Sequence, residues 1–232
     1  MRHHVRPLIL CITALAVLLC IASCSKDDPA QPNTSIHQSY EIEYDVQRNR
    51  TTGRAAFRAN SASGTQAQLT PPAAVLYNGT AMNWNNAEPY GYTLIENGRV
   101  EAALFEFTDA AGTVRTNSAT LASVPTIDLP AGVNELIVSS QATIAWQGAP
   151  VGAGETVSLI FNTAANGLAT YFQQSPGATS IILTPTDLAI LGAGTATWRL
   201  ERFVDLGLQS GTTAGGQIRV RWSTGDRPVT LK

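Results

Sequence analysis

The stretch YEIEYDV, residues 40–46, alternates apolar and acidic side chains at every step. Successive side chains of a β-strand point to opposite faces of a sheet, so this pattern predicts a strand with one buried and one solvated face. The buried face would hold Tyr40, Ile42, Tyr44 and Val46, and the solvated face Glu41, Glu43 and Asp45. The body of the chain is therefore expected to begin with a half-buried strand.

Short runs with strand character continue to the C-terminus, and no amphipathic helical pattern exceeds about two turns. These runs lie at residues 54–59, 66–70, 75–77, 92–96, 100–108, 135–139, 143–146, 156–161, 170–173, 180–184, 195–203 and 217–222. Asn78-Gly79 and Asn97-Gly98 are two-residue hairpin signals between strand formers. The sequence thus predicts an all-β fold made of β-sandwiches.

One short helix is expected near residue 185. Thr184 is a suitable N-cap, Pro185 suits the first helical position, and Asp187 would lie near the positive end of the helix dipole. Gly192 is a stop signal, so the helix would have one or two turns.

Proline and glycine interrupt the strand pattern within SVPTIDLPAGVNE, residues 123–135. This interruption favours two domains, residues 39–124 and residues 125–232, over the alternative of one continuous sandwich. The polar stretch up to residue 38 lacks apolar periodicity, so residues 24–38 are expected to be a tether.

The downstream part resembles immunoglobulin-like and fibronectin type III modules in its order of strands. Trp146, in ATIAWQG, stands where such modules often place a core tryptophan, and Trp198 stands in place of their usual corner tyrosine. The resemblance implies tandem immunoglobulin-like (fibronectin type III-like) β-sandwiches, with Ile144 and Trp146 facing Trp198 and Leu200 across the core.

The N-terminus has the features of an export signal. MRHHVR precedes sixteen residues, 7–22, in which Thr13 is the only polar side chain. As a helix this segment would span roughly 24 Å, less than the roughly 30 Å of a hydrocarbon core. A cleaved signal, residues 1–23, is therefore favoured over a membrane-spanning helix.

Ile21-Ala22-Ser23-Cys24 resembles the lipobox of bacterial lipoproteins, in which the cysteine receives a lipid and becomes the new N-terminus. Cys11 and Cys20 each follow a leucine, which is too bulky for that motif. The resemblance implies lipidation at Cys24 and attachment to a membrane through this anchor. The alternative is an ordinary signal peptide cleaved near a spare cysteine.

The residues behind Cys24 bear on location. Ser25 is not an aspartate, which by resemblance to bacterial sorting rules implies the outer membrane. Lys26, Asp27 and Asp28 resemble the surface-export signal of Bacteroidota lipoproteins and imply a chain that faces the exterior. The periplasmic face of the outer membrane is the alternative.

Charge and residue counts exclude several functions. Without Arg2 and Arg6, 13 of the 15 lysines and arginines remain against 17 acidic residues, a net charge of −4 that disfavours a nucleic-acid surface. After Cys24 there is no cysteine to form a disulfide. Only His37 remains among the histidines, and it falls in the expected tether, so no histidine-based triad or zinc site is expected.

No nucleotide, metal or hydrolase motif occurs, so neither a cofactor nor a metal is expected and the chain is predicted to be non-enzymatic. Asp109, which begins DAAG, is expected to form a type I turn, with calcium binding as a minor alternative.

The strongest binding signal is YNGTAMNWNNAEPYGY, residues 77–92. Aromatic rings stack on sugar faces and amides pair with sugar hydroxyls, so the candidate ligand-binding residues are Tyr77, Asn83, Trp84, Asn85, Asn86 and Tyr90. The alternative is that Tyr77 and Tyr92 are core residues, Trp84 covers a sheet edge and the asparagines form turns.

Two functions follow from these observations. The first is a cell-envelope lipoprotein that binds a glycan or protein ligand, as an adhesion or scaffold module. The second is a carboxylate-based hydrolase of polysaccharide, which needs two close carboxylates in a cleft. Its candidates are Glu41, Glu43, Glu88, Glu96, Glu101 and Glu106.

Arginines alternate with apolar residues in two late strands. Arg199 and Glu201 lie opposite Trp198 and Leu200, and Arg219 and Arg221 alternate with Ile218, Val220 and Trp222. If these two strands pair, Glu201 is expected to neutralise an arginine of the other strand.

Overall fold

The structure is a computed structural model that describes residues 28–29 and 35–232. Within these residues it is an all-β protein with one short α-helix and one 3-10 turn. The predicted fold class is confirmed at this level.

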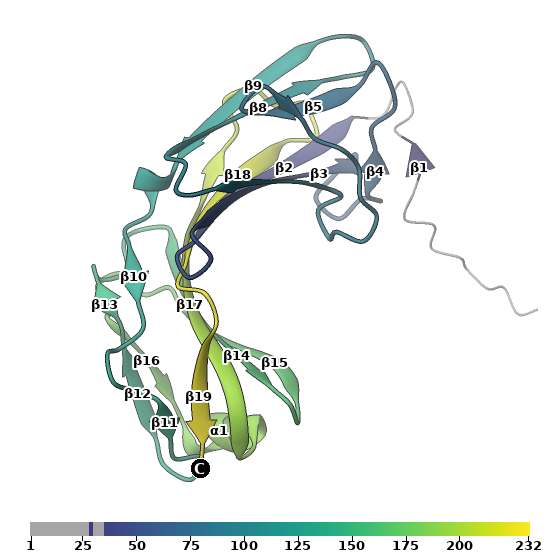
Figure 1. Ribbon diagram of the computed structural model, residues 1–232. Coiled ribbons are helices and arrows are strands. Elements are labelled where there is room, and N and C mark those ends of the chain that lie inside the picture. The colour runs from purple at the N-terminus through teal and green to yellow at the C-terminus, as the bar shows by residue number, and fades with distance from the viewer. Residues whose placement is uncertain (1–27, 30–34) are drawn as a thin grey trace, which may run out of the picture.

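A nine-stranded sheet, named here the long sheet, runs through the whole molecule (Figure 1). Seven of its strands follow one another as β11, β19, β17, β18, β2, β3 and β7, and β14 joins β17 to β15. Their bounds are β2 Ile36–Asp45, β3 Arg50–Ala59, β7 Tyr92–Asn97, β11 Glu135–Leu136, β14 Glu155–Thr163, β15 Gly167–Gln173, β17 Gly194–Gly207, β18 Gly216–Ser223 and β19 Arg227–Leu231.

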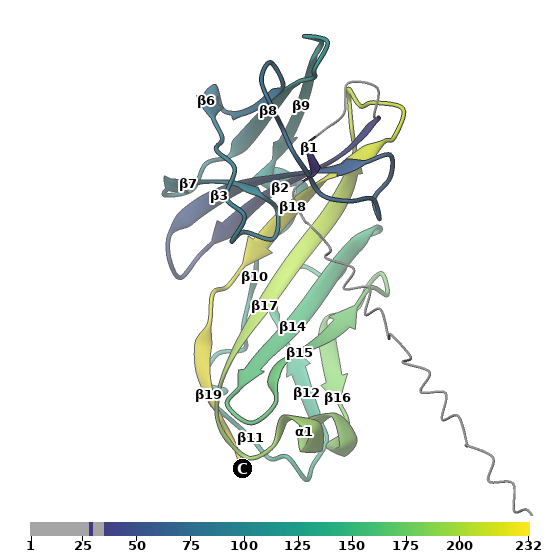
Figure 2. The same ribbon diagram turned by 90° about the vertical axis from the view of Figure 1, so that its right-hand side faces the viewer.

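Smaller sheets cover one face of the long sheet. A four-stranded sheet lies over β18, β2 and β3, two of the two-stranded sheets lie along the other half, and the third, made of β1 and β4, lies near β3 (Figure 1). Their strands are β4 Ala67–Gln68, β5 Ala74–Tyr77, β6 Thr80–Ala81, β8 Ala102–Thr108, β9 Val114–Thr120, β10 Ile127–Asp128, β12 Ala142–Ala145, β13 Gln147–Gly148 and β16 Ser180–Leu183, with β1 Asp28–Pro29 beside β4. The opposite face of the long sheet, named here the open face, is turned toward the viewer in Figure 2.

The alternating stretch forms β2 as predicted, with Tyr40, Ile42 and Tyr44 buried. The Tyr40 ring stacks on Phe105 of the covering sheet with centroids 4.7 Å apart. β2 ends at Asp45, so Val46 is exposed in the next turn and does not extend the buried face. The strand begins at Ile36, which places His37 in β2 opposite Arg58 and corrects its expected place in the tether.

β17 and β18 connect the two halves of the chain. Residues 194–198 of β17 pair with β19, residues 201–207 pair with β18, and β18 then pairs in parallel with β2. The long sheet therefore crosses the boundary that the sequence predicts between residues 124 and 125.

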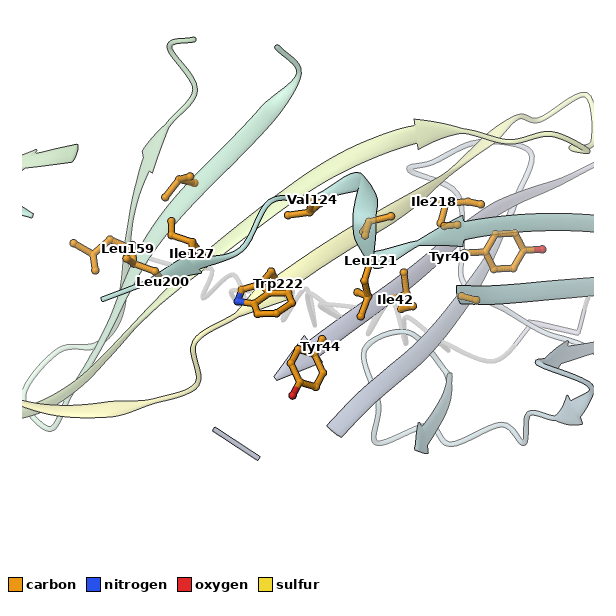
Figure 3. Packing of buried hydrophobic residues seen from close by; sticks show 14 of the residues in the cluster. Tyr40, Ile42, Tyr44, Leu121, Val124, Ile127, Leu159, Leu200, Ile218 and Trp222 are labelled. Atoms are coloured by element: carbon orange, nitrogen blue, oxygen red, sulfur yellow. The ribbon is translucent and has the colours of Figure 1, made fainter. Parts of the chain in front are cut away.

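The hydrophobic core crosses the same boundary (Figure 3). Leu121, in the 3-10 turn η1 (Leu121–Ser123), and then Val124 and Ile127 are buried and lie between Ile42 at one end and Leu200 at the other. Residues 123–135 thus include core positions instead of forming an exposed linker. The division into two domains stays a prediction.

Local signals were reliable at several turns. Asn78-Gly79 joins β5 to β6 with positive φ at both residues, as a type I′ hairpin requires. Helix α1, Pro185–Leu191, has the expected Thr184 N-cap within a capping box. Asn97-Gly98 is different, because the chain there leaves β7 of the long sheet for β8 of the covering sheet, so no hairpin forms.

Candidate functional site

The open face carries rows of charged side chains contributed by β2, β3, β17 and β18. The alternation of β2 puts Tyr40 and Ile42 into the core and therefore turns Glu41 and Glu43 to the open face. Glu41 stands opposite Arg54 on one neighbouring strand and Arg219 on the other. Strand register alone thus sets carboxylates beside guanidinium groups.

Glu41 is the centre of this arrangement. Its carboxylate accepts hydrogen bonds from Arg54 Nη1 at 2.5 Å, Arg221 Nη2 at 2.9 Å and the Tyr90 hydroxyl at 3.0 Å. These three side chains cover it so completely that only 1% of Glu41 is exposed. The expected solvated acidic face is therefore wrong for Glu41, because its neighbours replace water as hydrogen-bond donors.

Glu201 forms the second node. It binds Arg221 Nη1 at 2.7 Å and Arg199 Nε at 2.7 Å, and Arg199 continues to Asp226 at 2.9 Å. β17 pairs with β18, and Glu201 neutralises an arginine of that strand, as predicted. Burial lowers the pKa of Arg221, but the charges of Glu41 and Glu201 outweigh this effect and raise the pKa above its usual value.

Tyr90 covers the charged rows from a loop that precedes β7. Burial, and then the nearby Glu41 charge, raise the pKa of Tyr90 to about 12. The Arg54 guanidinium lies 5.8 Å from the centre of the Tyr90 ring. Tyr90 is thus held by Glu41 at its hydroxyl and approached by Arg54 at its ring.

A hollow of about 400 Å³ opens among these side chains. We name it the carboxylate–arginine hollow. It is lined by Glu41, Glu43, Asp45, Arg48, Arg50, Thr52, Arg54, Glu88, Pro89, Tyr90, Arg199, Glu201, Arg221 and Asp226.

Some of the side chains that line this hollow already use their hydrogen-bonding atoms within the protein, and others could still bind a ligand. Glu41 and Glu201 are fully engaged by arginines, whereas Glu43 binds Arg54 through Oε2 alone among the described residues. Arg50 lines the hollow, and its buried Nε has no hydrogen-bond partner within residues 35–232. Because this Nε is buried, the lining groups best placed to bind a ligand are Glu43 and Glu88, whose side chain makes no hydrogen bond within residues 35–232.

The candidate binding residues from YNGTAMNWNNAEPYGY do not form one surface. Tyr77 is fully buried, and its ring lies so close to Gly53 of β3 that a Cβ there would be 2.6 Å from it. Tyr77 is therefore a core residue and cannot touch a ligand. Only Tyr90 reaches the carboxylate–arginine hollow.

Trp84 is half-buried and packs edge-on against Tyr92, with ring centres 5.3 Å apart. Asn83, Asn85 and Asn86 are exposed, and Asn85 accepts a hydrogen bond from the backbone of Ala87 within the loop. These residues shape the loop that carries Tyr90. The sequence signal thus led to the correct loop, but the charged partners of Tyr90 come from distant strands.

Only some of the carboxylates proposed for a hydrolase lie close together. Glu41 and Glu43 both lie 2.5 Å from Arg54 Nη1, and Glu88 lines the same hollow, whereas Glu96, Glu101 and Glu106 do not. A general acid needs a carboxyl group that is kept protonated, typically by an apolar pocket. Glu41 is instead held by two arginines and Glu43 by one, so neither carboxylate has such an apolar setting.

Other predicted features are placed as follows. Asp109 forms its turn, with Gly112 N donating to the Asp109 carbonyl at 2.9 Å. Cys24, Lys26 and Asp27 lie outside the described residues, and Asp28 belongs to β1. In residues 28–29 and 35–232 no group of three or more His, Cys, Asp or Glu side chains could hold a metal ion.

Among the described residues no helix is both long enough and apolar enough to cross a membrane.

Comparisons with known proteins add little. No family model matches the chain, and no curated protein matches it. One solved structure that aligns with it concerns the host cell surface retention of a 1.5-MDa bacterial ice-binding adhesin, with 16% identity and a TM-score of 0.24. The alignment covers 89% of this chain and 66% of that chain, so this chain spans just under two thirds of its length. Likeness at this level carries no functional argument.

Proposed function

We propose that this chain is a non-enzymatic cell-envelope lipoprotein whose β-body binds a glycan in the carboxylate–arginine hollow. The observation that carries the proposal is a set of carboxylates and guanidinium groups fixed by ion pairs on the open face of the long sheet, with Tyr90 over them. A glycan-binding role for Tyr90 was expected from its loop, and the hollow supplies its partners.

The chemistry of the hollow suits sugar hydroxyls. A carboxylate oxygen accepts and a guanidinium donates hydrogen bonds, so both sides of a hydroxyl group can be satisfied. Because ion pairs hold these side chains in place before a ligand arrives, little entropy is lost on binding. Six acidic residues face five arginines in the lining, a near balance that favours an uncharged ligand.

The anchor and the location belong to the same proposal and rest on sequence. Cys24 would carry the lipid, and Lys26, Asp27 and Asp28 would direct the chain to the outer membrane and its outward face. Residues 125–232 are proposed to be an immunoglobulin-like or fibronectin type III-like module, for which the burial of Trp146 and Trp198 is supporting evidence.

The test is a glycan array probed with the full chain, expressed with its own N-terminal segment and solubilised in detergent. We expect binding to a defined set of glycans, weakened about tenfold or more by Glu43→Gln, which removes one charged acceptor. Glu106→Gln is the matched control, because Glu106 lies on β8 of the covering sheet and outside the hollow.

Three outcomes would contradict the proposal. Absence of binding to every glycan would remove it, as would equal binding by the Glu43→Gln chain. Release of new reducing ends from a bound polysaccharide would replace it with the hydrolase alternative.

A further inference from the structure

A second hollow of about 280 Å³ lies on the open face beside the first. Its lining includes Ser39, Arg58, Gln217 and Arg219, and it shares Pro89 and Tyr90 with the carboxylate–arginine hollow. Tyr90 therefore stands between two hollows, where a single ligand can touch both.

The two hollows lie end to end along the strands. On β2, Ser39 lines the smaller hollow, and Glu43 and Asp45 line the larger one. β18 runs parallel to β2, and Arg219 and Arg221 follow the same order. At roughly 3.3 Å per residue, Ser39 to Asp45 spans roughly 20 Å, which is long for one sugar ring.

From this arrangement we infer that the ligand is a linear oligosaccharide that passes Tyr90 and occupies both hollows. The inference rests on the proposed glycan-binding function and adds the length of the ligand. Tyr90 would contact the middle of the chain, and the hollows would hold sugars on either side.

The smaller hollow offers neutral groups and one arginine, Arg58, whose Nη1 donates to the Gly64 carbonyl at 3.2 Å and which has no acidic partner among the described residues. The guanidinium of Arg219 is occupied, since it binds Asp205 through two hydrogen bonds of 2.8 Å and lies 4.2 Å from the Phe203 ring centre. Ser39 and Gln217 make no side-chain hydrogen bond within residues 35–232, and Gln217 is exposed. A hydroxyl and an amide donate and accept, as sugar hydroxyls require.

A peptide is the less suitable occupant. β2 is already paired on both sides, with β3 and with β18, so its backbone has no free edge onto which an extended peptide could add. Recognition on this face must use side chains, which suits a ligand rich in hydroxyl groups.

The inference is tested by measuring affinities for linear oligosaccharides of glucose, mannose and xylose, from monosaccharide to hexasaccharide, using the full chain in detergent. We expect affinity to rise beyond the disaccharide. Ser39→Ala combined with Gln217→Ala should weaken the hexasaccharide about tenfold and leave the disaccharide unchanged. Glu43→Gln should weaken both.

Each other result has a distinct meaning. The inference fails and the proposed function stands if glycans bind but affinity stops rising at the disaccharide. The same holds if the double variant binds both the disaccharide and the hexasaccharide as well as the parent does, or binds both more weakly. If no glycan binds and a peptide library does, both fail. Cooperative unfolding in denaturant shows that the variants are folded, with an unchanged midpoint expected for the double variant and a slightly lower one for Glu43→Gln.

Discussion

Tyr90 donates a hydrogen bond to Glu41 Oε2 across 3.0 Å, although 49 positions separate the two residues in the chain. This contact fastens the loop before β7 to the centre of the long sheet. It also completes the cover over a carboxylate that would otherwise meet water, so loop and charge network stabilise each other.

Tyr90→Phe should therefore lower the free energy of unfolding at neutral pH by about 0.5 to 1.5 kcal/mol, the usual contribution of one hydrogen bond. The pKa of Tyr90 is raised from 10.0 to about 12, mainly by burial and then by Glu41. When the pKa of a group is higher in the folded than in the unfolded chain, its contribution to stability is complete at pH values below the unfolded-state pKa. That contribution is lost as the pH rises through the folded-state pKa. The parent should lose stability between about pH 10 and 12.

Denaturant titrations across this pH interval check the prediction. Tyr40 and Tyr77 also have raised pKa values because of burial, so the Tyr90→Phe chain should still lose stability there, but with a smaller slope. Identical slopes for parent and variant would show that Tyr90 titrates as it does in the unfolded chain.

Glu41→Gln should destabilise the chain much more than Glu43→Gln. Removing Glu41 leaves Arg54 and Arg221 short of a partner in a buried setting, which costs about 3 to 5 kcal/mol. Glu43 is more exposed and pairs with one arginine only, so its loss should cost about 1 kcal/mol or less. Denaturant unfolding of the two variants measures this difference in stability. Similar denaturation midpoints would contradict the central role of Glu41.

Trp146→Ala should cost about 3 to 5 kcal/mol, because Trp146 is buried and its Nε1 donates to the Ala149 carbonyl at 3.0 Å. Trp84→Ala should cost clearly less, since Trp84 is half-buried in a loop. Denaturant unfolding of both variants tests this difference. A mild effect at Trp146 would contradict its place in the core.

Cys24→Ala should abolish acyl incorporation and block lipoprotein-specific cleavage, because Cys24 is the cysteine that follows small residues. Intact-mass measurement of the parent and the variant purified from membranes shows whether acyl chains are attached. An unmodified Cys24 in the parent would refute the anchor.

Replacement of Lys26, Asp27 and Asp28 by alanine should leave the chain lipidated but protected from protease added outside the cell. The parent should be digested under the same conditions. Equal digestion of both would show that these three residues carry no sorting information.

Local features were predictable because short segments encode them. The alternation at Tyr40 and Ile42, the Asn78-Gly79 turn and the Thr184 cap all depend on neighbours within a few residues. The pairing of Glu201 with Arg221 was also predictable, once two late strands were assumed to be adjacent.

The arrangement around Glu41 was not predictable from periodicity. Its burial depends on Arg221, 180 positions away, and on Tyr90, 49 positions away. Alternation indicates which face of the sheet a side chain takes but not which strand lies beside it. A face that is predicted to be solvated can therefore be buried by side chains from distant parts of the chain. Of the two interpretations of Tyr77, ligand contact and core, the sequence could not choose the core for a related reason, since the Tyr77 ring packs on Gly53 of another strand.

The parallel pairing of β2 with β18 also sets an order of events during synthesis. β2 emerges among the first strands, yet one of its two neighbours in the long sheet is made only with residues 216–223. Contacts between such distant segments close slowly, because a long loop must be ordered first. A chain released before residue 216 therefore carries a bare β2 edge, onto which a strand of a second, equally unfinished copy can add.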